Sequence, residues 1–228
     1  MRPFELLNWP SVGPDGERRD ELALAFDRRR ARRLLVLPAW FQEANKMRRQ
    51  TVEVMRRLDV SGIDSFLPDL PGCNESESPL AEQTLTGWRH AADVARSYFR
   101  ATHVLAIRAG TLVAPREMPG WHYAPLAGAR MLRSLVRAQA IADAEGGRGR
   151  PGPALLEEAR THGAVLAGWH LGSAIFNAIE SATPTEGLVE IEQSALPGSA
   201  LWLRAEPSEA PEQAEAIAAI IADGIGPA

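Results

Sequence analysis

Short apolar runs alternate along the chain with longer segments whose apolar residues recur every three or four positions. The runs Arg33–Pro38, Ser65–Pro68 and Thr102–Ile107 are short and mostly apolar, which predicts buried strands. Helical periodicity fills the two segments between them, from Gln42 to about Leu58 and from Pro79 to Arg100. Strands that alternate with helices in this way predict βαβ units and a mostly parallel sheet.

The two ends of the chain carry a less regular pattern. Glu21–Phe26 fits a strand and a helix equally well, so its period does not decide between them. The other elements expected here are an extended piece at Phe4–Leu7, a polar turn at Gly13–Gly16, strands at Leu188–Ile191 and Ala200–Leu203, and an alanine-rich helix at Ala210–Ala222.

The pattern changes after Thr102–Ile107. Gly110–Met118 has room for only two helical turns and contains Pro115, which interrupts a helix. A short strand at Trp121–Pro125 and a helix at Leu126–Ala144 follow. That helix is apolar on most of its circumference, which makes it a candidate for homodimer contacts.

A lid-like helical insertion is expected at about residues 126–162. The stretch Gly146–Pro153 is rich in glycine and proline, which is typical of a flexible connection. A short helix at Ala154–His162, an apolar run at Ala164–Gly168 and a helix at Gly172–Ser181 complete this part of the chain.

Composition limits the class of protein. With 228 residues, 45% hydrophobic and 24% charged, the chain fits one globular α/β domain. No apolar run is long enough to span a membrane and no signal peptide is recognisable at the start, so we expect a cytoplasmic protein. A single cysteine excludes an intrachain disulfide.

Charge narrows the choice of partners. The net charge is −4, and Lys46 is the only lysine among 25 basic residues. A GC-rich genome explains this bias towards arginine, so the arginines do not by themselves indicate nucleic-acid binding. The five histidines lack the spacing of a metal site, and no cofactor motif is present, so we expect neither a metal nor a cofactor.

The segment that ends the third apolar run has the form of a nucleophile elbow with one exception. In an elbow, G-x-S-x-G, small residues flank a nucleophile on a tight strand-to-helix turn. Here the sequence is Ala106-Ile107-Arg108-Ala109-Gly110, so the small flanks are kept but arginine is central. Pro38-Ala39-Trp40 stands where an oxyanion loop would be, and the later DLPGCNES stretch, residues 69–76, resembles a D-x-x-G-x-G-x-S loop.

The stretch FQEANKMRRQ, residues 41–50, sharpens this likeness. It resembles the F-x-E-E-x-N-K-x-R-R segment of the exosortase A system-associated hydrolases, in particular the type 2 group. The stretches WHYAPLAG (121–128) and AGWHL (167–171) are similar to that group's W-x-P-x-x-x-G and A-G-Y-x-L. The resemblance runs from about Arg33 to Ser181. It implies an α/β-hydrolase-like three-layer αβα sandwich and an association with exopolysaccharide and protein-sorting gene clusters of Gram-negative bacteria.

The residues needed for acyl hydrolysis are missing. A guanidinium stays protonated, so Arg108 cannot act as a nucleophile. In this fold a histidine beyond the last strand serves as the base, but none follows His170. The shortened helix after Arg108 also weakens an oxyanion site. We therefore interpret the chain as catalytically degenerate, a pseudoenzyme.

Two functional readings follow from these residues. In the first, the protein binds an anionic ligand or a partner protein. The candidate binding residues are Trp40, Glu43, Asn45, Lys46, Arg49, Arg108 and Trp169. Glu43 would pair with Arg108 or Lys46, and the Arg108 fork suits a carboxylate or phosphate, or equally an internal salt bridge that fills the old site.

In the second reading the protein is an active carboxylic ester or thioester hydrolase or an acyltransferase. Its nucleophile would be Cys73, with His122 or His170 as base, or a non-standard site.

Overall fold

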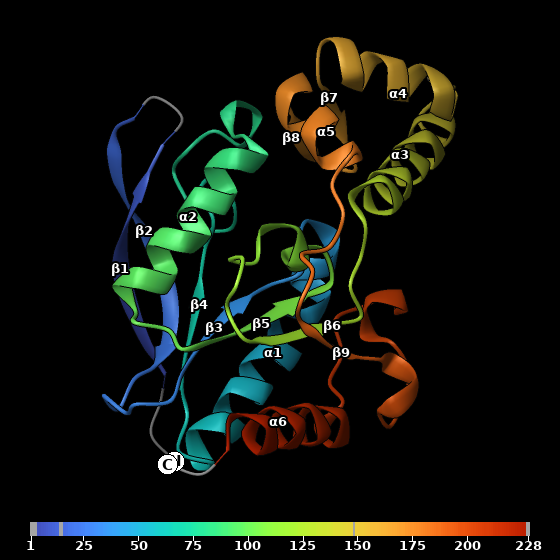
Figure 1. The fold of residues 1–228 in the computed structure, drawn as a ribbon. Coiled ribbons are helices and arrows are strands. Elements are labelled where there is room, and N and C mark those ends of the chain that lie inside the picture. The colour runs from blue at the N-terminus through green and yellow to red at the C-terminus, as the bar shows by residue number, and fades with distance from the viewer. Residues whose placement is uncertain (1–3, 14–15, 148, 227–228) are drawn as a thin grey trace.

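The computed structural model describes residues 4–13, 16–147 and 149–226. Within them a seven-stranded sheet has the order β1-β2-β4-β3-β5-β6-β9 (Figure 1). The strands are β1 (Glu5–Val12), β2 (Arg18–Phe26), β3 (Arg33–Leu37), β4 (Asp64–Pro68), β5 (His103–Ile107), β6 (Gly120–Tyr123) and β9 (Val189–Ile191). From β4 to β9 all neighbours are parallel, whereas β1 and β2 are antiparallel additions at one edge. The mostly parallel sheet predicted from the sequence is confirmed.

The N-terminal hairpin resolves the ambiguous pattern there. Glu21–Phe26 belongs to strand β2, and the extended piece expected at Phe4–Leu7 is the start of a longer strand, β1. Neighbouring β4 buries all its residues and pairs with β2, so the sheet sets the conformation that the period of β2 left open. Of the predicted turn at Gly13–Gly16, Pro14 and Asp15 lie outside the described residues.

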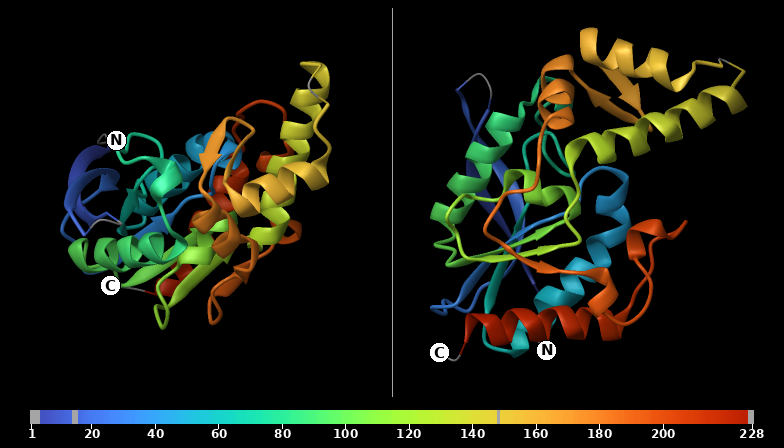
Figure 2. Two further views of the ribbon diagram at one scale, coloured as in Figure 1. Left: turned by 90° about the horizontal axis from the view of Figure 1, so that it is seen from above. Right: turned by 45° about the vertical axis from the view of Figure 1, so that its right-hand side comes forward.

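Helices cover both faces of the sheet and make three layers (Figures 1 and 2). Helices α1 (Gln42–Val60) and α6 (Pro211–Ile225) pack on one face, where Met47, Met55 and Leu58 of α1 are buried as their spacing predicts. Helix α2 (Leu85–Tyr98) packs on the other face.

The single helix expected from Pro79 to Arg100 is wrong at its start. Only a short 3₁₀ turn, η1 (Leu80–Glu82), precedes α2. Helix α2 begins at Leu85 because the Thr84 hydroxyl accepts a hydrogen bond from the Gly87 N–H and caps it.

The chain between β6 and β9 forms a separate helical part beside the carboxyl ends of the strands (Figure 2). It contains α3 (Gly128–Glu145), α4 (Gly152–Thr161), the hairpin β7 (Ala164–Leu166) and β8 (Trp169–Leu171), and α5 (Ser173–Glu180). This part extends past residue 162, where the sequence placed the end of a lid-like insertion.

Two expectations about this part need correction. Helix α3 is not apolar all round, because it buries one face and exposes Arg133 and Arg137. The glycine-rich connection, which was expected to be flexible, is anchored near its end, because Arg150 forms ion pairs with Asp143 and Glu158. Arg148 of this connection lies outside the described residues.

The strand expected at Ala200–Leu203 is wrong. That segment is a 3₁₀ turn, η4 (Leu201–Leu203), whereas the expected Leu188–Ile191 strand is present as β9. A second 3₁₀ turn, η3 (Gln193–Ala195), lies between them. Pro197, Gly198 and Ser199 intervene, and they favour turns over an extended pairing. Among the described residues, no helix has the length and apolarity needed to cross a bilayer.

Candidate functional site

Arg108 stands at the strand-to-turn position where an elbow nucleophile would be. It follows β5 directly, is only 9% exposed, and has φ of 53°, in the left-handed region that is costly for a side chain other than glycine. The small flanking residues are needed for close packing. A Cβ added to Gly110 would lie 2.5 Å from the Leu37 carbonyl oxygen.

The Arg108 guanidinium is held on three sides. Its Nε and Nη2 donate to the two carboxylate oxygens of Glu43, at 2.9 and 3.1 Å, and Nη1 donates to the Ala124 carbonyl at 2.8 Å. The Trp202 ring covers it, with 4.1 Å from Cζ to the ring centroid. The predicted pairing of Glu43 is therefore confirmed with Arg108, in the bidentate geometry of strong charge-assisted bonds.

The turn after Arg108 is shorter than the sequence predicted. A 3₁₀ turn, η2 (Arg108–Val113), replaces the two helical turns expected at Gly110–Met118, and it ends before Pro115. An α-helix at this point would direct aligned backbone N–H groups at a bound anion. A six-residue 3₁₀ turn offers no such array.

The polar residues at the start of α1 do not converge on one pocket. Lys46 Nζ lies 3.5 Å from the Trp202 carbonyl oxygen, and Arg49 forms an ion pair with Glu209. Asn45 is exposed. Of these polar residues, Glu43 and Lys46 lie at the Arg108 site. Lys46 contacts the backbone carbonyl of Trp202, and Arg108 contacts its ring.

The two predicted tryptophans meet in a different place. Trp40 and Trp169 line one cavity together with Phe41, Leu70 and Cys73, but Arg108 is not among its lining residues. The cavity volume is about 20 Å³, which holds about one water molecule. The Trp40 indole N–H is buried here without a hydrogen-bond partner in the described residues. Of the candidate binding residues, Trp40 and Trp169 therefore share a cavity that does not include Arg108.

Cys73 is poorly suited to nucleophilic chemistry. Burial, together with the charges of Asp69 and Glu21, raises the pKa of its thiol to about 12. The reactive form of cysteine is the thiolate, which this environment disfavours. None of the described residues forms a hydrogen bond with its side chain, so no base is in place.

The two candidate histidines lie elsewhere. His170, on β8, is exposed. His122, on β6, has Nδ1 3.4 Å from the Thr111 hydroxyl and Nε2 3.9 Å from a Glu190 carboxylate oxygen. Burial lowers the pKa of His122, while Glu190 opposes the shift. Thr111 is completely buried, whereas the Glu190 side chain is 51% exposed, so neither neighbour makes His122 the base of a nucleophile in the described residues.

Some residues around Arg108 were not singled out by the sequence, and they include Trp202 near the C-terminal end and Tyr123 on β6. Besides Trp202, the Tyr123 ring packs edge-on against Trp202 at 5.6 Å, and its hydroxyl donates to Gln193 and Gln213. The apolar residues around Trp202 are the available signal, but their pattern predicts a strand, whereas the segment is the 3₁₀ turn η4. Within the described parts of the chain, no group of three or more His, Cys, Asp or Glu side chains could hold a metal ion.

Comparison with known proteins defines the fold. No protein-family model matches the chain, and no curated protein matches it. The structure is similar to a provisionally named hydrolase from Agrobacterium vitis S4, with TM-score 0.51 and 14% identity over 96% of this chain and 100% of that one. It is also similar to DcsB in complex with a substrate analogue, with TM-score 0.54 and 10% identity over 98% and 100%. The chain has an α/β-hydrolase fold. At identities this low, the similarity shows the fold alone.

Proposed function

We propose that this α/β-hydrolase-fold protein is a pseudoenzyme that works by binding, and that its ligand is an anionic lipid or saccharide intermediate. The observation that carries the proposal is the Arg108–Glu43 ion pair at the elbow. A nucleophile position filled by a permanently charged and internally paired side chain has no acyl-transfer role.

The surroundings of the elbow support the loss of catalysis. The half-buried Cys73 and the histidines at positions 122 and 170 do not form a nucleophile and base within hydrogen-bond reach. The resemblance of residues 41–50 to exosortase A system-associated hydrolases supports a role beside exopolysaccharide chemistry. We extend the proposal to a divergent, type 2-like member acting in the cytoplasm of a Gram-negative bacterium.

Lys46 and Arg108 supply the positive charge for such a ligand. Lys46 has no carboxylate partner among the described residues, and its only polar contact there is the Trp202 carbonyl. Arg108 keeps two of its five N–H donors outside the bonds to Glu43 and Ala124. A ligand that displaces the Trp202 segment would meet both cations.

A turnover assay tests the loss of catalysis. We expect wild type and Cys73→Ala to hydrolyse p-nitrophenyl acetate, p-nitrophenyl butyrate and acetyl-CoA at the same background rate. Turnover that disappears in Cys73→Ala would overturn the pseudoenzyme proposal in favour of a cysteine hydrolase or acyltransferase.

Calorimetric titration tests the binding role, with octanoate as the lipid-like probe and galacturonate as the saccharide-like probe. We expect one of them to bind wild type and to bind Lys46→Gln several-fold more weakly. Arg133→Gln, which removes one exposed charge from α3, is the matched control and leaves the affinity unchanged. Equal binding by all three proteins would contradict a ligand at Lys46.

A further inference from the structure

A second concentration of positive charge lies at the opposite end of the strands from Arg108. The loop from β2 to β3 and the end of α2 enclose a groove of about 650 Å³, which we call the arginine groove. Its lining includes Asp27, Arg29, Arg30, Arg33, Tyr98 and Arg100. Four arginines against one aspartate give the lining a net positive charge.

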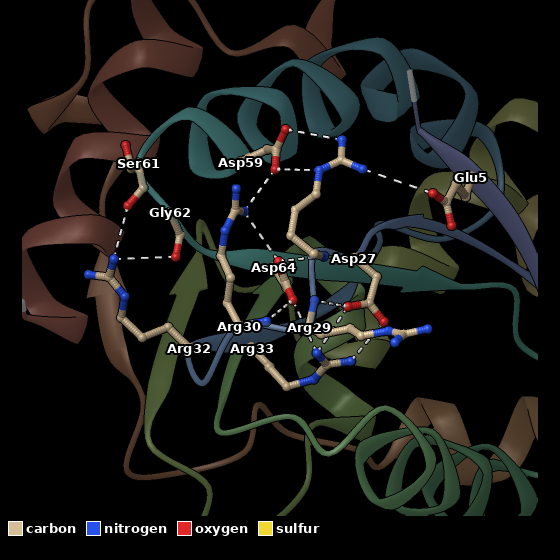
Figure 3. A network of polar contacts seen from close by, with 11 residues as sticks. Glu5, Asp27, Arg29, Arg30, Arg32, Arg33, Asp59, Ser61, Gly62 and Asp64 are labelled. Carbon is tan, nitrogen blue, oxygen red and sulfur yellow. Dashed lines mark hydrogen bonds and ion pairs between the residues drawn. The ribbon is translucent and has the colours of Figure 1, made fainter. Parts of the chain in front are cut away.

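Two of the four arginines are neutralised within the protein. Arg33 donates to both carboxylate oxygens of Asp27 and to Asp64, and Arg30 donates to Asp59 and Asp64 (Figure 3). Asp64 is fully buried, so this network ties the loop to the core of the sheet. Arg30 and Arg33 therefore form the fixed floor of the groove.

The other two arginines, Arg29 and Arg100, are exposed and available. Neither guanidinium forms a hydrogen bond or ion pair with any of the described residues, 4–13, 16–147 and 149–226. Two unpaired guanidinium groups on the lining of one groove repel each other. An anion bound between them would remove that repulsion.

Their backbone conformations strengthen this point. Arg29 has φ of 60° and Arg100 has φ of 51°, so both occupy the left-handed region, where glycine is favoured. Arg100 follows the end of α2, the position at which helices most often carry glycine. A GC-rich genome explains arginine in place of lysine, but glycine codons are equally GC-rich. Arginine at both sites therefore has a backbone cost that glycine would not have.

Tyr98 adds a flat surface to the same groove. Its side chain is 51% exposed, although its hydroxyl donates to the Asn8 carbonyl at 3.2 Å. That hydrogen bond fixes the end of the ring, and the exposed part of the residue is available to a planar group.

We propose that the arginine groove binds a diphosphate group, with Arg29 and Arg100 each engaging one phosphate. Guanidinium forks match phosphate oxygens in bidentate geometry, and two separate cations favour two linked phosphates over one. The volume falls in the range of small-molecule sites, so there is space for a further group beside the diphosphate. In a nucleoside diphosphate that group would stack on Tyr98. This site is at the amino end of β3 and does not depend on the function proposed for the Arg108 site.

Calorimetric titration with pyrophosphate and ADP at low ionic strength tests the proposal. The variants are Arg29→Gly and Arg100→Gly, because glycine suits both backbone conformations and keeps the fold intact. We expect each to weaken pyrophosphate binding about tenfold or more, with a melting temperature no lower than that of wild type. The double variant Arg133→Gln/Arg137→Gln removes two exposed charges from α3 and leaves binding unchanged.

The two probes separate the sources of the diphosphate. If the natural ligand is a nucleotide, ADP binds more tightly than pyrophosphate, and Tyr98→Ala removes only that difference. If ADP and pyrophosphate bind equally, the groove recognises the diphosphate alone. No binding by wild type, or an equal loss of affinity in the α3 double variant, would overturn the proposal.

Discussion

The Arg108–Glu43 ion pair allows a sharp test of how the elbow is held. We consider Glu43→Gln, which keeps the size and a hydrogen-bond acceptor but removes the charge. Removing one partner of a buried ion pair costs about 3–5 kcal/mol, because the other charge stays buried without its partner. The side chains of Arg108 and Glu43 are 10% and 16% exposed, so water retains some access to both. We therefore expect a loss of about 2–3 kcal/mol in the free energy of unfolding.

Urea denaturation of wild type, Glu43→Gln, Arg108→Met and the double variant measures the coupling between the two side chains. We expect a coupling free energy of about 2 kcal/mol, and a melting temperature about 4–12 °C lower for Glu43→Gln. The double variant should be less destabilised than the sum of the single variants, since it leaves no unpaired charge.

Arg160 and Glu180 provide a matched control. They form the same bidentate arrangement at 3.0 and 2.7 Å, but their side chains are 43% and 30% exposed. The cycle with Arg160→Met and Glu180→Gln should give a coupling below about 1 kcal/mol. If both pairs give the same coupling, burial of the elbow pair does not strengthen it and our reasoning about the Arg108 site is refuted.

Three further predictions test other parts of the structure. Gly110→Ala should destabilise the protein by about 1–3 kcal/mol in urea denaturation, because its Cβ would lie 2.5 Å from the Leu37 carbonyl oxygen. Gly152→Ala is the control, and it should lower the free energy of unfolding much less, because the nearest neighbour of its Cβ would be at 3.7 Å. Equal costs would contradict this packing. Cys73 should resist iodoacetamide in the native protein at pH 8 and react on unfolding, since burial raises its pKa to about 12; rapid native labelling would show an accessible thiolate. Burial opposes ionisation of Asp27, but hydrogen bonds from Arg33 and the Arg29 N–H lower its pKa to about 2. The ionised Asp27 therefore stabilises the folded protein fully above its unfolded-state pKa, and this stabilisation is lost as the pH falls towards 2. The stability difference between wild type and Asp27→Asn should therefore shrink between about pH 4 and 2, and a difference that stays constant over this range would be inconsistent with that pKa.

Much of the central sheet is predictable from the sequence, because its signals are local. The apolar runs that form β3, β4 and β5 are bounded by turn-forming or polar residues, and a parallel strand buried on both faces needs little further information. The elbow is predictable for the same reason, since the small residues around Arg108 reflect close backbone contact. The short strand β9 and the turn η4 are harder, because three-residue segments carry almost no periodicity.

The candidate site also has features that the sequence predicts and features that only the tertiary structure reveals. The sequence by itself determined that arginine stands between small residues at the predicted elbow and that no histidine follows His170, and it predicted Arg108 or Lys46 as the partner of Glu43. Only the tertiary structure decided which partner Glu43 takes, that Trp202 covers the guanidinium, and that Trp40 and Trp169 close a separate small cavity. The physical reason is distance along the chain. Residue type and short-range spacing are local properties, whereas the contacts that pair, cover and bury a charge join segments that the fold alone brings together.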